Sequence, residues 1–272
     1  MSRMEVSNLT REMFSKILAE GKRFDGRGLL DLRDFEIETD ISKNAEGSAR
    51  VRLGKTDVVV GIKLGTGEPF PDSPDKGNLI VSSDLLPLAS PRFEHGPPGF
   101  NAIELPRLID RIVRESGIIE LDKLCIKKGE NVWSVFIDIY PLNDDGALVD
   151  AASIATVIAL KSTVLPELDK EGKVDYKNRT KNKIPLVKEI IPLLFTFYKL
   201  DNSLLLDPTR EEAEACDGKI TWGISKLKGQ YFLNACQKGL EVPITKEEIE
   251  EILKILPKKY EERLKELERF LK

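Results

Sequence analysis

The sequence has few of the residues that metal sites and nucleophilic triads need. Its 272 residues include a single histidine, His95, and three cysteines without CxxC spacing. One histidine makes a zinc site or a Ser-His-Asp triad hard to assemble, and His95 lies in the Pro/Gly-rich stretch HGPPGF, which is typical of a loop. The odd number of cysteines favours small buried residues over a disulfide framework. We therefore expect no metal and no cofactor.

Long apolar runs and a basic charge balance are also missing. No apolar stretch reaches the roughly 18 residues that cross a bilayer, and residues 1–21 form an acid-containing amphipathic pattern instead of a signal peptide. We therefore expect a cytoplasmic protein with no membrane partner. The net charge is −4, whereas a nucleic-acid binder usually has a basic balance. Any polyanion would have to meet a local basic patch.

Hydrophobic periodicity divides the chain into a β-rich half, helices, a second β-rich half and a final helix. Helices are expected at about 8–20, 102–117 and 151–163, and a C-terminal helix should begin at the capping box of Thr245 and Glu248 and break at Pro257. Strands are expected at 35–41, 49–54, 57–65, 132–140, 193–199, 203–207, 219–226 and 230–237. The charged stretch 169–183 is interpreted as a solvated hairpin or insertion. These elements predict an α+β fold, which a duplicated β-β-α-type unit would fit, although repetition between the halves is faint.

The stretch LNDDGALVDAASIA, residues 142–155, has the form of a phosphate-binding loop. An acidic pair and a glycine precede a run of small residues that is typical of a buried helix, and backbone N–H groups at such a helix start favour anions. Yet Ala147, Leu148 and Val149 occupy the positions where a phosphate site would need Ser, Thr, Arg or Lys. The stretch is therefore either a catalytic loop without its ligands or a loop that was never a site.

Several segments, in the right order, resemble the RNase PH family of phosphate-dependent exoribonucleases and exosome ring subunits. They are RFDGR (23–27), GSARVRLGKTDVVVGIK (47–63), AIELPRLIDRIVRES (102–116) and LVDAASIATVIAL (148–160). Three further segments resemble the branch of non-catalytic ring subunits of the archaeal exosome: PDKGNLIVSSDLLPLA (74–89), EHGPPGFNAIEL (94–105) and LLLDPTREEA (204–213). The resemblance implies an RNase PH-like fold, of the ribosomal protein S5 domain 2-like class. It divides the chain into an N-terminal helix (1–21), two RNase PH-like parts (22–165 and 166–240) and a C-terminal helical segment (241–272).

The resemblance also implies which catalytic groups to look for. Active members carry an arginine pair before the first long helix and a Gly-Gly-Thr/Ser-Arg segment that holds phosphate. The matching positions here are Phe100-Asn101 and Gly146-Ala147-Leu148-Val149, which supply neither guanidinium nor hydroxyl. The family's aspartate pair is matched by Glu211 and Asp217, or by Glu212 if the alignment slips by one. An acidic pair alone is more often a solvated turn, so we interpret this one as vestigial and the chain as catalytically inactive.

The remaining candidate functional residues are basic side chains. Arg107, Arg111 and Arg114 are spaced i, i+4 and i+7, which places them along one helix face. They could contact RNA phosphates, with Arg92 and His95 as weaker candidates on the preceding loop. Alternatively, the three could pair with a neighbouring subunit or with the acids of their own helix. Those acids are Glu104, Asp110 and Glu115.

The resemblance implies a non-catalytic subunit that supports 3′-to-5′ RNA degradation by structuring its partner's active site. The partner would be the catalytic RNase PH-like subunit in a heterohexameric ring, a trimer of dimers, joined by S1- and KH-domain RNA-binding cap subunits. One alternative is a free-standing phosphate-dependent exoribonuclease that uses Asp217. Another is an unrelated α+β protein whose basic helix is an ordinary surface.

Overall fold

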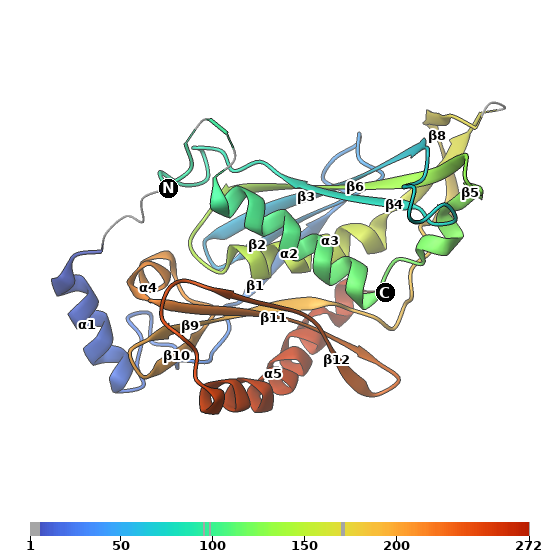
Figure 1. Cartoon of the computed structure of the whole chain (residues 1–272). Helices are drawn as coiled ribbons and strands as arrows, with labels where there is room; N and C mark the ends of the chain where they lie inside the picture. Colours follow the sequence, from blue (N-terminus) through green and yellow to red (C-terminus); the bar gives the residue numbers. More distant parts are fainter. Residues whose placement is uncertain (1–5, 95, 98, 170–171, 272) are drawn as a thin grey trace.

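Two antiparallel-rich sheets enclose a pair of helices in the computed structural model, which describes residues 6–94, 96–97, 99–169 and 172–271. Figure 1 shows α2 and α3 between the sheets and α5 on the outer side of the second sheet. The α-helices are α1 (Asn8–Ala19), α2 (Phe100–Ser116), α3 (Leu148–Ser162), α4 (Arg210–Ala215) and α5 (Lys246–Leu267). Two short 3-10 helices span Leu121–Leu124 and Glu268–Phe270.

The first sheet has the strand order β1-β2-β3-β6-β4, with β5 paired to β6, and only β4 and β6 run parallel. The second sheet has the order β10-β9-β11-β12 and is antiparallel throughout, and β7 and β8 form a separate hairpin. The strands of the first sheet are β1 (Phe35–Thr39), β2 (Gly47–Leu53), β3 (Thr56–Gly67), β4 (Asn78–Ser83), β5 (Cys125–Lys127) and β6 (Asn131–Asn143). The others are β7 (Val164–Leu168), β8 (Val174–Lys183), β9 (Leu193–Leu200), β10 (Ser203–Leu206), β11 (Gly218–Leu227) and β12 (Gln230–Gly239).

The helix α3 is buried on all sides because both sheets pack against it. Its residues Asp150–Leu160 are all buried, and most are small or β-branched, which lets two sheets approach one helix closely. The approach leaves no room for a side chain at Gly47, where a Cβ would lie 2.2 Å from Thr163 Oγ1. Packing of this kind fixes α3, and with it the loop 144–147 that precedes it, relative to both sheets.

Most predicted elements are confirmed with shifts of one to a few residues at their ends. The helices predicted at 8–20, 102–117 and 151–163 are α1, α2 and α3, and the charged stretch contributes β8 to a hairpin with β7. The capping box is also confirmed, since Thr245 Oγ1 accepts from Glu248 N and Glu248 accepts in return from Thr245 N. The strands β4, β5 and β7 and the short helix α4 were not predicted.

The predicted break at Pro257 is wrong. The helix α5 continues through this residue from Lys246 to Leu267. Proline removes one helical hydrogen bond, but buried side chains on both sides of it, including Ile252 and Tyr260, hold the two turns against the core. Tertiary packing therefore outweighs the local cost.

No helix within the described part of the chain is long and apolar enough to span a membrane.

Candidate functional site

A cavity of about 410 Å³ lies at the start of α3, where both halves of the chain meet. Its walls come from the loop before α3 and the first turn of α3, from the loop between β4 and α2, and from the start of α2. The strands β9 and β11, the helix α4 and the residue after β12 complete the walls. The lining residues are Leu85, Arg92, Phe93, Phe100, Glu104, Leu105, Asp144, Gly146, Ala147, Leu148, Val149, Thr196, Tyr198, Ala213, Glu214, Lys219 and Leu240. The stretch that resembles a phosphate loop therefore borders a cavity large enough for a small molecule.

The loop is held rigidly by residues that lie far away in the sequence. Gly146 has a positive φ of 85°, and a Cβ there would lie 2.3 Å from the carbonyl oxygen of Pro208. Its own carbonyl accepts from Thr56 Oγ1 at 2.6 Å and from Arg33 Nη2 at 3.2 Å. Ala147, which precedes α3, has a left-handed conformation and provides no side-chain cap. The backbone of the loop is therefore fixed, but the side chains that the loop contributes to the cavity wall carry no hydroxyl group and no positive charge.

Both cations that line the cavity are already paired with carboxylates. Arg92 Nη2 lies 2.6 Å from Asp144 Oδ2, and its Nη1 lies 3.3 Å from Glu214 Oε1. Lys219 Nζ lies 2.7 Å from Glu104 Oε2. Sequence reasoning identified Arg92 as a weaker RNA candidate but missed Glu214 and Lys219, which come from distant α4 and β11 and show no local signal. Neither cation is free to neutralise an anionic ligand, so the cavity is poorly suited to binding an unpaired anion.

The acidic pair does not line the cavity. Glu211 is exposed on the first turn of α4. Glu212 is buried, caps α4 and accepts from Arg23 Nε at 2.9 Å. Asp217 forms an ion pair with Arg11 of α1. Glu212 and Asp217 are therefore held by partners that stabilise the fold, whereas Glu211 is an exposed carboxylate outside the cavity lining.

One acid beside the cavity has an unusual proton affinity. Burial is the largest influence on Asp150 and raises its pKa from 3.8 to about 7, against the opposite effect of hydrogen bonds from Thr196. Thr196 donates its hydroxyl to Oδ1 at 2.7 Å and its backbone N–H to Oδ2 at 3.1 Å. Burial also raises the pKa of the Tyr198 phenol in the cavity wall, so this group stays protonated.

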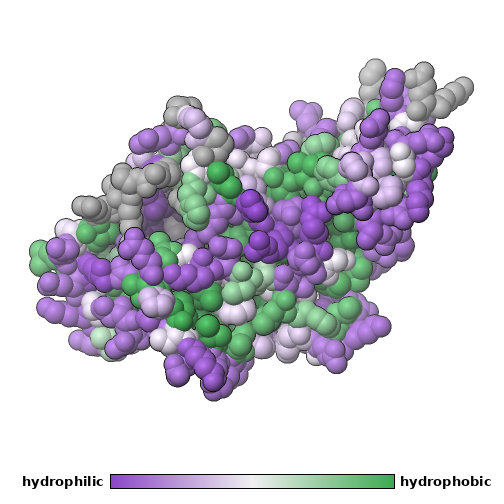
Figure 2. Space-filling view, viewed as in Figure 1, coloured by the Kyte–Doolittle hydropathy of each residue, from purple (hydrophilic) through white to green (hydrophobic). Residues whose placement is uncertain are grey.

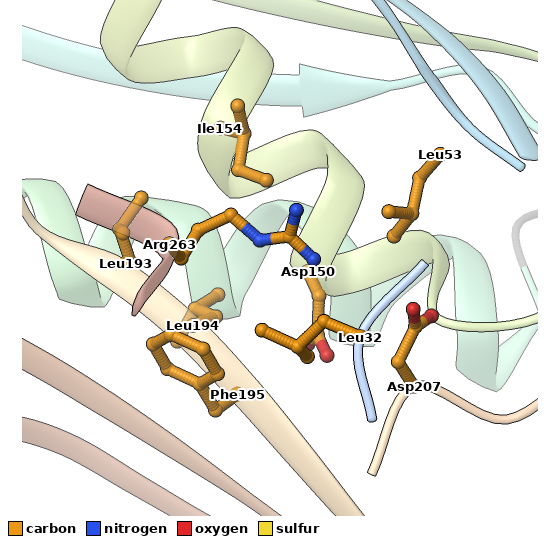
Figure 3. A pocket seen from close by; sticks show the side chains of 9 residues that line it. All are labelled: Leu32, Leu53, Asp150, Ile154, Leu193, Leu194, Phe195, Asp207 and Arg263. Carbon is orange, nitrogen blue, oxygen red and sulfur yellow. The ribbon is translucent and has the colours of Figure 1, made fainter. Parts of the chain in front are cut away.

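A second void, of about 10 Å³, lies on the other side of Asp150 and is close to the smallest volume that holds a water. Figure 3 shows Asp150, Asp207 and Arg263 around it, from α3, the segment after β10, and α5. Arg263 is 3% exposed and donates to the carbonyl oxygen of Arg33 at 3.1 Å, while Asp207 pairs with the Arg33 guanidinium at 2.7 Å. This cluster joins the two halves of the chain and leaves no room for a ligand.

The three α2 arginines have different surroundings. Arg114 Nη2 lies 2.7 Å from Asp110 Oδ1 and also donates to the carbonyl oxygen of Leu79. Arg107 and Arg111 are exposed, and neither makes an ion pair or a side-chain hydrogen bond with any residue that the structure describes. Figure 2 shows a strongly hydrophilic band over α2 with apolar patches on either side. Because Glu104 turns to Lys219 instead, the predicted pairing within the helix holds for Arg114 alone among the described residues.

Two of the positions named from the sequence cannot be placed. His95 lies outside the described residues, and so does the side chain of Asn101. The neighbouring Phe100 does line the cavity and is 66% exposed.

The chain belongs to the 3′ exoribonuclease family: the family's domain 1 matches residues 31–166, and its domain 2 matches residues 191–255. It is similar to the exosome complex component Rrp42 of Methanothermobacter thermautotrophicus, at 41% identity over 90% of this chain and 89% of that protein. The Thermococcus kodakarensis Rrp42 is 42% identical over 95% of this chain and 94% of its own length.

Solved structures agree with the family. One, described as the Archaeoglobus fulgidus exosome with RNA bound to the active site, has a chain with a TM-score of 0.84 and 38% identity, covering 94% of this chain and 98% of that chain. Another, described as an archaeal exosome core, has a chain with a TM-score of 0.78 and 35% identity, covering 91% of this chain and 92% of its own. The predicted RNase PH-like α+β fold is thereby confirmed.

Proposed function

We propose that this chain is a ring subunit of an archaeal exosome that does not itself catalyse phosphorolysis. Its proposed role is to support 3′-to-5′ RNA degradation by completing the active site of a catalytic RNase PH-like neighbour. The names of its relatives support the assembly, since chains about 41–46% identical to it are exosome components called Rrp42. The cap subunits with S1 or KH domains belong to the same proposal.

The observation that carries the non-catalytic part is the cavity beside α3. Phosphorolysis needs phosphate held next to the RNA 3′ end and positive charge or donors for the negative charge that develops. Ala147, Leu148 and Val149 supply neither, and the two cations in the wall are paired with carboxylates. This arrangement supports a site that has lost its phosphate ligands.

The alternative of a free-standing exoribonuclease using Asp217 has less support. Asp217 lies outside the cavity lining and pairs with Arg11, and Glu212 pairs with Arg23. Removing even one donor of developing negative charge typically lowers a rate by about 10²–10³. A site that lacks several such groups should be inactive.

Association with a partner is the first test. The chain should be co-expressed with a catalytic RNase PH-like subunit and sized by light scattering, and we expect a heterohexamer at micromolar concentration. Obligate interfaces of such rings bury large apolar areas, so the ring should survive dilution and gel filtration. A chain that stays monomeric beside its partner would contradict the proposal.

A further inference from the structure

The carboxylate of Glu104 is incompletely satisfied in the wall of the cavity. Its side chain is 9% exposed, and its Oε2 accepts from Lys219 Nζ at 2.7 Å. Its Oε1 is buried and has no hydrogen-bond partner among the described residues. A buried carboxylate oxygen without a donor is costly, so this position is one where a ligand's N–H group would be stabilising.

The polar groups of the lining favour a cation over an anion. Three carboxylates, of Glu104, Asp144 and Glu214, face two cations, Arg92 and Lys219. Each of the two cations is already paired with a carboxylate. Arg210 Nε also lies 3.8 Å from Glu214 Oε1, so the formal charges balance. Glu104 Oε1, unpartnered among the described residues, is the feature that attracts an N–H cation and repels inorganic phosphate.

The remaining walls define what kind of cation fits. Within the described part of the chain, no group of three or more His, Cys, Asp or Glu side chains could hold a metal ion. Apolar side chains, including Phe93, Leu105, Leu148 and Val149, supply much of the lining. A cavity of about 410 Å³ falls within the size range of small-molecule sites. A bare metal ion would leave this apolar surface unused.

We propose that this cavity binds a small protonated alkylamine, a monocation with an apolar body. Its ammonium group donates to Glu104 Oε1, and its hydrocarbon part packs against Leu148 and Val149. The protonated phenol of Tyr198 stands in the same wall as a second polar contact. A former phosphate position would thus take a ligand of the opposite charge, independently of any ring assembly.

The test uses the full chain and 3-methylbutylammonium chloride as the probe, with binding followed by chemical shifts in NMR. The neutral isostere 3-methylbutanol and inorganic phosphate serve as comparison ligands. We expect the amine to bind with a Kd at or below about 10 mM, and both comparison ligands to bind at least about tenfold more weakly. No binding of the amine, or tighter binding of phosphate, would overturn the proposal.

Substitutions in the cavity wall test whether the amine binds in this cavity. Glu104→Gln keeps the shape and removes the charge, and it should weaken the amine at least about tenfold. Glu115→Gln is the matched control, an exposed glutamate on the same helix outside the cavity lining, and should leave binding unchanged. Because Glu104→Gln also loosens Lys219, Leu148→Phe is a second variant, which narrows the cavity while keeping every charge and should also weaken binding. Amine binding that neither cavity variant changes would show that the site lies elsewhere.

Discussion

Arg107 and Arg111 differ from Arg114 in having no acidic partner within the described part of the chain. Exposed arginines on an acidic protein are usually close to carboxylates, because ion pairs of surface helices form readily at i, i+4. On α2, Glu104 pairs with Lys219 and Asp110 pairs with Arg114, while Glu115, four residues after Arg111, makes no ion pair with it in the described part of the chain. Two guanidinium groups on one face therefore remain for an external anion, and RNA phosphate is the candidate that the proposed function supplies.

Replacing these arginines in an assembled ring tests that assignment. Arg107→Ala and Arg111→Ala should weaken RNA binding for all sequences alike, because phosphate contacts do not read bases. The slope of log affinity against log salt should flatten by about 0.7 for each lost contact. Arg114→Ala is the internal comparison and should have a smaller effect on RNA, because Asp110 holds its guanidinium.

Ring mass and melting temperature must be measured on the same variants. Unchanged RNA affinity per intact ring, with a lower melting temperature or a smaller particle, would assign Arg107 and Arg111 to subunit contacts instead.

Asp150 gives a prediction about pH. Its carboxyl releases a proton near pH 3.8 in the unfolded chain and near pH 7 in the folded chain, so the folded state binds more protons between these values. The contribution of Asp150 to stability is therefore greatest below about pH 4, and this contribution falls as the pH rises towards 7. Asp150→Asn should remove a slope of up to about 1.4 kcal/mol per pH unit from the free energy of unfolding. Urea titrations of both proteins between about pH 4.5 and 7.5 measure the difference, and parallel curves would refute the assignment.

Single residues also show which features of the site could be predicted from the sequence. The missing phosphate ligands at Ala147, Leu148 and Val149 were visible in the sequence, because they depend on residue type at one loop. The pairing of Arg92 with Asp144 and Glu214 was not, since it joins three segments that folding brings together. Patterns within a helix predict which arginines share a face, but which acids are occupied depends on distant residues such as Lys219.

Among the secondary-structure elements, α5 shows tertiary packing deciding against local propensity. Proline favours a helix break, yet Pro257 lies inside a continuous helix. Tyr260, one turn further on, is fully buried and donates to the carbonyl oxygen of Ile191 at 2.8 Å. A sequence window around Pro257 does not contain Ile191, so it could not predict this anchor.

The contribution of that anchor can be measured. Tyr260→Phe leaves the buried carbonyl of Ile191 without this donor and should lower the free energy of unfolding by about 1–2 kcal/mol. Tyr231→Phe is the matched control, because Tyr231 is 42% exposed and its hydroxyl bonds to Glu261 at the surface. The control should change stability by less than about 0.5 kcal/mol. Equal effects of the two substitutions in urea unfolding would contradict the role of Tyr260 as an anchor.

At the scale of the whole molecule, the two family domains meet around α3 and the loop before it. The Arg33–Asp207 ion pair and the close approach of Gly146 to the carbonyl oxygen of Pro208 cross this junction. Such a junction keeps a cavity open without any phosphate ligand in its wall, because the contacts around the cavity do not depend on a substrate. The fold of the family is therefore compatible with the proposed lack of phosphorolytic activity in this chain.

Release of nucleoside diphosphates from RNA in the presence of inorganic phosphate tests the non-catalytic assignment most directly. The purified chain alone should release none above background, whereas the reconstituted ring with a catalytic RNase PH-like subunit should degrade the same RNA. Asp217→Asn should leave the activity of an intact ring unchanged within about twofold, because Asp217 lies outside the cavity and pairs with Arg11. Phosphate-dependent diphosphate release by the pure chain, abolished by Asp217→Asn, would contradict the assignment.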